Sequence, residues 1–234
     1  MKRNTLIMAF ISLIFLFALP VNSQNRFDYV VFGIRVAGGG SLMNGWDNYT
    51  NRFPGTNIII DQPYTTSPYF AWDIGVSMQT MYNSKVLIQS DLTFGYQATS
   101  LKDGSLEGIL SFEGIGSYYT TLSVYAGSKI LLGERTRFVF GIGPYVATSD
   151  WFSGKDKKYG KNVLPSEMDY YTDATLLIKE ADFRSIDAGA TAMVGIEFSN
   201  VQLSLNYYHG LANIVKDEHR LYNRSLKLAV TSFF

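Results

Sequence analysis

YNRSLKLAVTSFF, residues 222–234, ends the chain and decides its fold class. Its side chains alternate, and the apolar ones that share one face of a strand are Leu226, Leu228, Val230 and Phe234. In lipid every backbone N–H and C=O must be paired within the protein, so strands cross a membrane only as a closed barrel. A strand of this pattern with a terminal aromatic residue is typical of outer-membrane β-barrels. We therefore expect the four apolar side chains to form the signal that the barrel-insertion machinery recognises.

Seven earlier stretches alternate with the same period of two residues, which is the signature of half-buried strands. They are residues 30–36, 70–80, 85–96, 117–130, 136–147, 185–198 and 201–208. Most stretches place aliphatic or aromatic side chains on one face and mainly glycine, polar or charged side chains on the other. Tyr125 and Tyr145 fall on the second face. With the terminal strand they predict an all-β fold, an eight-stranded antiparallel transmembrane up-and-down β-barrel surrounded by outer-membrane lipid.

The connections between these stretches alternate in length. Short connections lie near residues 82–84, 132–135 and 199–200, and long ones run near residues 43–69, 98–116, 149–183 and 211–221. Outer-membrane barrels have short periplasmic turns and longer extracellular loops. We therefore expect the N- and C-termini on the periplasmic side and the long loops outside the cell.

The N-terminus has the pattern of a secretory signal peptide. Two cations at residues 2–3 precede an apolar run over residues 6–19, and small residues lead to Ser23. An uncleaved membrane anchor is the alternative, but it needs about 20 apolar residues, more than this run offers. We expect residues 1–23 to be removed and residues 24–234 to form the barrel domain. The sequence has no cysteine, so we expect neither a lipoprotein anchor nor a disulfide.

Composition narrows the function. The formal net charge is zero at pH 7, so no basic excess points to nucleic acid as a partner. The 16 Tyr and 16 Phe suit two aromatic girdles at the membrane interfaces. No spacing of His or Cys suggests zinc, and we expect no cofactor and no metal. Asp47, Asn48, Asn51 and Asp61 offer oxygens to calcium, but they lack the regular spacing of a calcium-binding loop.

The chain has two histidines, His209 and His219, and both fall near the loop end of the predicted barrel. Barrel enzymes of the outer membrane place Ser-His-acid groups at this rim. Ser, Asp and Glu are available near both histidines, but loops are rich in these residue types anyway. We therefore expect no catalytic residue, and a rim enzyme that acts on lipid or peptide is the least favoured interpretation.

The inward faces of the predicted strands carry charges of both signs. An eight-stranded barrel is just wide enough for its inward side chains to fill it, and a buried charge costs several kcal/mol unless it is paired. We therefore interpret these residues as a lumen charge network that closes the barrel, with an ion path or ligand site as the alternative. The network is Arg35, Asp73, Asp91, Lys129, Arg137, Asp187, Glu197 and Lys227.

Two segments carry motifs beyond simple alternation. Residues 140–155 read FGIGPYVATSDWFSGK, and residues 187–214 read DAGATAMVGIEFSNVQLSLNYYHGLANI, with a Gly-x-Glu-aromatic strand end and a Tyr-x-x-Gly-Leu-x-Asn-Ile exit. Both segments resemble the PorT-like outer-membrane β-barrels of Bacteroidetes-type bacteria, the second more closely. The resemblance implies an outer-membrane barrel without an assigned reaction. The namesake of that family is associated with a protein secretion and gliding apparatus.

The long loops carry aromatic and charged side chains that suit binding to proteins, glycans or lipopolysaccharide. Solvated loops with interfacial aromatics explain the same residues equally well. The candidates are Trp46, Tyr49, Phe53 and Tyr64 in the first loop and Trp151, Phe152, Lys155, Lys157 and Lys158 in the third. We expect a non-catalytic structural or binding component of a larger envelope assembly, with another envelope protein as its partner. A narrow pore or transporter for small solutes is the alternative.

Overall fold

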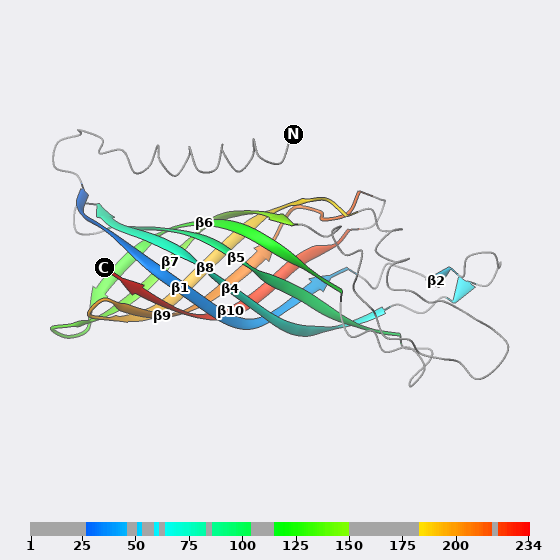
Figure 1. Cartoon of the computed structure of the whole chain (residues 1–234), viewed down its shortest axis with the longest axis horizontal. Coiled ribbons are helices and arrows are strands. Elements are labelled where there is room, and N and C mark those ends of the chain that lie inside the picture. Colours follow the sequence, from blue (N-terminus) through cyan, green and yellow to red (C-terminus); the bar gives the residue numbers. More distant parts are fainter. Residues whose placement is uncertain are drawn as a thin grey trace.

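The computed structural model describes residues 27–45, 51–52, 59–60, 64–82, 86–103, 115–149, 183–216 and 220–234. These residues form a closed barrel of eight strands in which each strand pairs antiparallel with its neighbours (Figure 1). The predicted fold class is confirmed. No helix within these ranges is long and apolar enough to cross a membrane. The predicted signal peptide, residues 1–23, lies outside them.

The barrel follows the order of the sequence, and β1 pairs with β10 to close it. Its strands are β1 (Phe27–Asn44), β4 (Tyr64–Tyr82), β5 (Val86–Asp103), β6 (Ile115–Leu131), β7 (Thr136–Ser149), β8 (Ile186–Phe198), β9 (Val201–Gly210) and β10 (Tyr222–Phe233). Two short strands, β2 (Asn51–Arg52) and β3 (Ile59–Ile60), form a separate two-stranded sheet.

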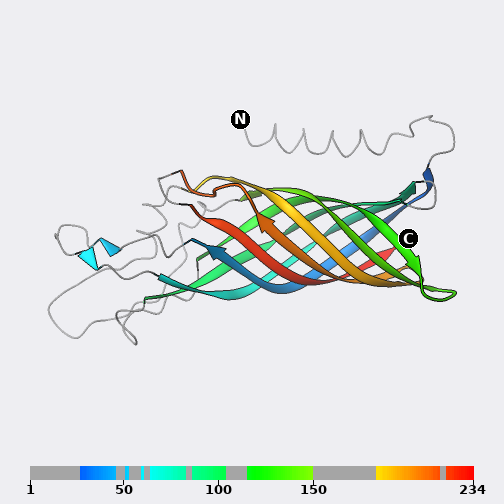
Figure 2. The ribbon, with the colours of Figure 1, turned by 180° about the vertical axis from the view of Figure 1, so that it is seen from behind.

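The two ends of the barrel differ in their connections. Short connections over residues 83–85, 132–135 and 199–200 join strands at the end where the C-terminus lies, here called the turn end. The longer connections leave from the opposite end, the loop end (Figure 2). At the turn end Ser199 adopts the left-handed backbone conformation (φ 55°), and its N–H donates to the carbonyl of Arg135 at 2.9 Å. This bond ties two neighbouring turns together.

Several strands are longer at the loop end than the alternation predicts. β1 continues to Asn44, which pairs with Tyr222, and β4 begins at Tyr64, which pairs with Asp103. The assignment of Tyr64 to the first loop is therefore wrong, because Tyr64 is a strand residue. The apolar pattern stops earlier than the hydrogen-bonded ladder, since a strand that continues past the lipid needs no apolar face.

The alternation of the sequence sets which side chains point into the lumen. Along β9, for example, Val201, Leu203 and Leu205 are exposed, and Gln202 and Ser204 are buried. At one inward position the neighbouring strand leaves room only for glycine. A Cβ atom on Gly39 would collide with the backbone carbonyl oxygen of Leu226, so β1 and β10 approach too closely for any side chain there.

Candidate functional site

The outward face of the barrel is apolar over its middle. Ile142 is 70% exposed, Ile34 57% and Val76 55%, and they belong to a band of aliphatic side chains around the circumference. A monomeric soluble protein rarely exposes a continuous apolar surface of this extent. The band is the surface that a transmembrane barrel presents to lipid chains.

Aromatic side chains border this band at both ends. At the turn end they are Phe32, Tyr82, Phe138, Phe198 and Phe234, and at the loop end Phe70, Trp72, Tyr96, Tyr118, Tyr207 and Tyr222. At the loop end the rings contact one another, with Phe94 and Tyr118 stacked at 5.8 Å between centroids. At ~3.3 Å per residue and a tilt of ~40°, Tyr222 and Phe234 are roughly 30 Å apart along the barrel axis. This separation is the thickness of a bilayer core.

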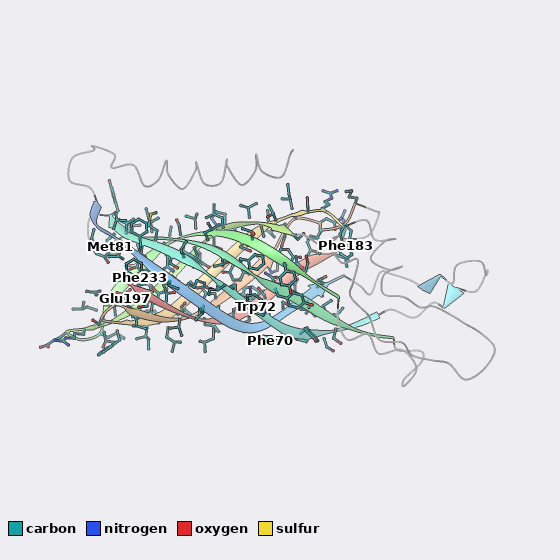
Figure 3. All side chains as sticks on the ribbon, viewed as in Figure 1. Phe70, Trp72, Met81, Phe183, Glu197 and Phe233 are labelled. Carbon is teal, nitrogen blue, oxygen red and sulfur yellow. The ribbon has the colours of Figure 1, made fainter. Side chains whose placement is uncertain are left out.

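The lumen near the turn end is filled by a cluster around Glu197. Lys129 Nζ lies 2.6 Å and 2.8 Å from the two carboxylate oxygens of Glu197, and Arg137 Nη1 lies 2.8 Å from Oε1. Gln79 Nε2 donates to Glu197 at 3.4 Å and to Gln202 at 3.1 Å. Figure 3 places Glu197 near the turn end together with Met81 and Phe233. Only Arg137 reaches solvent, with its side chain 40% exposed.

The middle of the lumen holds a second group of charges from four strands. Lys227 Nζ contacts Asp73 Oδ2 at 2.9 Å, and Arg35 lies 3.4 Å from Asp73 and 3.5 Å from Asp91. Asp73 and Lys227 flank β1, where their register partners are the small residues Ala37 and Gly39. The two long side chains therefore meet across β1. The four charges sum to zero, so the group is neutral inside the barrel.

Tyrosine side chains fill the next level. The Tyr125 hydroxyl lies 3.2 Å from that of Tyr208, and Thr191 Oγ1 donates to Tyr125 at 3.3 Å. The Tyr208 ring lies 5.4 Å from Lys227 Nζ and meets the Tyr145 ring edge-on at 5.5 Å. These rings join the charged middle of the lumen to its loop end.

At the loop end the lumen holds a polar group around Asp187. Tyr145 Oη and Asn223 Nδ2 donate to Asp187 Oδ2 at 3.1 Å and 3.0 Å, and Asn223 also donates to Tyr119 Oη at 3.0 Å. Asp187, Asn223 and Tyr119 are all buried. We define the mouth cap as the buried apolar residues at this end of the barrel, namely Met43 near the end of β1, and Phe183, Ile214, Val215 and Leu221 in the adjoining segments.

Backbone contacts hold the mouth cap in place. Phe183 forms an isolated antiparallel bridge with Val215, and Arg184 N–H donates to the carbonyl of Ile214 at 2.7 Å. Asn213 Oδ1 accepts from the backbone N–H of Leu221 at 2.9 Å. Figure 3 shows Phe183 at the loop end of the barrel.

The structure divides the predicted charge network into three parts. Lys129, Arg137 and Glu197 meet near the turn end, whereas the charges from β1, β4, β5 and β10 meet in the middle. Asp187 joins neither part and is bonded to a hydroxyl and an amide. Sequence analysis missed the uncharged lumen residues Tyr125, Tyr208, Gln79, Gln89, Gln202 and Asn223. Their inward position in the alternation was visible, but a search for charges passes over them.

The remaining predicted residues lie elsewhere. His209 Nδ1 lies 3.1 Å from the Tyr207 hydroxyl on the outward face of the barrel. The outward faces of β8, β9 and β10 carry no acidic side chain that could pair with this histidine. Within the described ranges no three His, Cys, Asp or Glu side chains form a metal-binding group. The structure does not describe Trp46, Tyr49, Phe53, Trp151, Phe152, Lys155, Lys157 and Lys158, nor His219, Asp47, Asn48, Asp61 and the side chain of Asn51.

The band, girdles and lumen together define the class of protein. A closed antiparallel barrel with a packed polar interior and an apolar band between two aromatic girdles is a transmembrane β-barrel of the outer-membrane type. The outward side chains predicted for the last strand, Leu226, Leu228, Val230 and Phe234, all lie on its exposed face.

No family model matches the chain, and no curated protein matches it. Among solved structures it is similar to Ail of Yersinia pestis in complex with the heparin analogue sucrose octasulfate, at 12% identity and a TM-score of 0.38 over 88% of this chain and 99% of that chain. It is also similar to Neisserial surface protein A, at 9% identity and a TM-score of 0.43 over 88% of this chain and 100% of that chain. A third similar structure is outer membrane protein OprG from Pseudomonas aeruginosa, at 10% identity and a TM-score of 0.42 over 86% of this chain and 93% of that chain. Because these TM-scores are low, the class rests on the chain's own band, girdles and lumen.

Proposed function

We propose that this chain is an outer-membrane barrel that acts as a non-catalytic structural or binding component of a larger envelope assembly. The observation that supports this proposal is the filled lumen. From the turn end to the mouth cap, each described level is occupied by buried side chains that contact one another. A barrel filled in this way leaves its outer surfaces to carry the function.

The proposal assigns the binding role to the loop end. By the general arrangement of outer-membrane barrels, the turn end and both termini face the periplasm and the loops face outward. Strands position such loops, and loops carry specificity. The motif resemblance to PorT-like barrels in residues 140–155 and 187–214 supports a secretion or surface complex as the assembly, with another envelope protein as the partner.

Ion conductance distinguishes this proposal from a pore for small solutes. The purified barrel in planar lipid bilayers is expected to give no single-channel steps. Asp91→Asn is the informative variant, because Asp91 is fully buried in the middle of the lumen, where any ion path would pass. Steps in the wild type whose size or selectivity changes with Asp91→Asn would establish the pore in place of the scaffold.

Co-purification tests the binding role. Replacing residues 151–161 with a short Gly-Ser turn should leave the barrel folded, because loop-closure entropy changes slowly with length. Any protein that co-purifies from native membranes in mild detergent should then be lost. Asp91→Asn is the matched control, since it alters the lumen and leaves the loop intact. Retention of every partner by the loop variant would contradict the proposal.

A further inference from the structure

A small polar group interrupts the outward face at the loop end of β9 and β10. We name it the interfacial patch and define it as Tyr207, His209, Tyr222 and Arg224. These side chains share the outward parity of Leu205 and the other aliphatic residues of the lipid-facing band. The patch therefore faces the membrane and not the lumen.

The register places the patch at the membrane interface. Arg224 pairs directly with His209, and the next outward pair toward the turn end is Tyr207 with Leu226. Arg224 is thus about 7 Å along the strand from the first leucine of the lipid-facing band. Aromatic rings such as Tyr207 concentrate at the depth of the lipid head groups, so the Arg224 guanidinium lies at the level where lipid phosphates are found.

Arg224 has no anionic partner among the described residues. Its side chain is half-buried, and its Nε is covered without a hydrogen-bond acceptor. Among the residues that the structure describes, no hydrogen bond or ion pair involves this guanidinium. A counter-charge stabilises a cation that is partly removed from water, and no described residue supplies one to Arg224.

The charge of the surrounding surface favours an anion. The outward faces of β8, β9 and β10 carry no acidic residue, and Arg184 and Arg220 are exposed on the segments that adjoin the same strands. Asp217 and Glu218 are nearby in the sequence but lie outside the described ranges.

We propose that the interfacial patch binds the phosphate of a membrane lipid in the leaflet at the loop end. Arg224 donates paired N–H groups to the phosphate oxygens, the geometry in which a guanidinium binds phosphate well. The Tyr207 hydroxyl and the His209 ring, 3.1 Å apart, hydrogen-bond each other and leave one further donor at the same level. The inference requires only that the barrel lies in a membrane, and it is independent of any envelope partner.

Native mass spectrometry of the full barrel, released from detergent micelles, tests the assignment. The barrel is titrated with diphosphorylated lipid A, with phosphatidylglycerol and with a phosphate-free glycosyl diacylglycerol. We expect a phosphorylated lipid to be retained and the phosphate-free lipid to be lost. Arg224→Gln keeps hydrogen-bonding capacity without the charge and should weaken retention by roughly tenfold or more. Arg135→Gln removes an exposed cation at the turn end and should leave retention unchanged.

Three results would overturn the proposal. The first is equal retention of the phosphorylated lipid by the wild type and by Arg224→Gln, when both proteins show the heat-modifiable migration of a folded barrel. The second is equal retention of phosphorylated and phosphate-free lipids by the wild type, a comparison that needs no variant to fold. The third is full competition by inorganic phosphate at the lipid concentration, which would assign the site to a free anion.

Discussion

Glu197→Gln is the sharpest test of how the lumen is held together. The wild-type carboxylate neutralises Lys129, whose side chain is 5% exposed, and Arg137, whose side chain is 40% exposed. The amide keeps the shape of the side chain but removes the negative charge, so two cations remain beside an uncharged group. Breaking a buried pair by removing one partner costs about 3–5 kcal/mol. Arg137 can turn toward solvent and accounts for no more than about 1 kcal/mol, so most of the loss comes from Lys129.

The assay is urea unfolding of the barrel in phospholipid vesicles, followed by tryptophan fluorescence. Glu134→Gln is the matched control, because Glu134 is exposed in the turn after β6 and should change stability by less than about 0.5 kcal/mol. The double variant Glu197→Gln with Lys129→Met should recover part of the loss, since removing both members of a buried pair is often neutral. Two results would refute the reasoning. One is a loss of unfolding free energy below about 1 kcal/mol for Glu197→Gln. The other is a double variant whose loss equals the sum of the losses of the two single variants.

Three further predictions concern the surfaces around the lumen. Leu205→Arg should cost about 2–4 kcal/mol of barrel stability in the same unfolding assay, because Leu205 faces the lipid core. If Leu205→Arg lowers stability no more than the loop change Lys158→Arg, the assignment of Leu205 to the lipid-facing side is contradicted. Gly39→Ala should lower the unfolding midpoint, because the added Cβ meets the backbone of β10, whereas Gly133→Ala, with open space around it, should not. Deleting residues 233–234 should leave periplasmic aggregates, and normal amounts of heat-modifiable barrel in the outer membrane after that deletion would contradict the insertion signal.

Sequence alone predicted the parts of the fold that depend on alternation. The contrast between an apolar exterior and a polar lumen repeats every two residues, so the inward position of Arg35 and the outward position of Leu228 follow from counting along each strand. The number of strands followed for the same reason. The loop-end boundaries did not follow, because β4 continues to Tyr64 beyond the region where lipid imposes a pattern.

Sequence could not predict which inward charges would meet. Asp73 and Lys227 contact each other although their strands are not neighbours, and they do so because Ala37 and Gly39 leave room across β1. That contact depends on the relative shift of three strands, which is a property of the closed barrel and not of any one segment. The mouth cap depends similarly on Phe183 and Val215, two residues of irregular segments that no periodic pattern marks.

Under the proposed function, the packed lumen leaves the outer surfaces of the barrel to bind a partner. The turn end offers only short connections, and the band and girdles face lipid. The loop end combines the long connections with the mouth cap, whose Phe183 lies directly after the third long connection and whose Ile214 and Val215 lie in the fourth. The segments that hold these cap residues also adjoin the strands that carry Asp187 and Asn223. The proposed binding surface at the loop end and the mouth cap share these short segments, so loop and lumen variants have to be compared in one set of experiments.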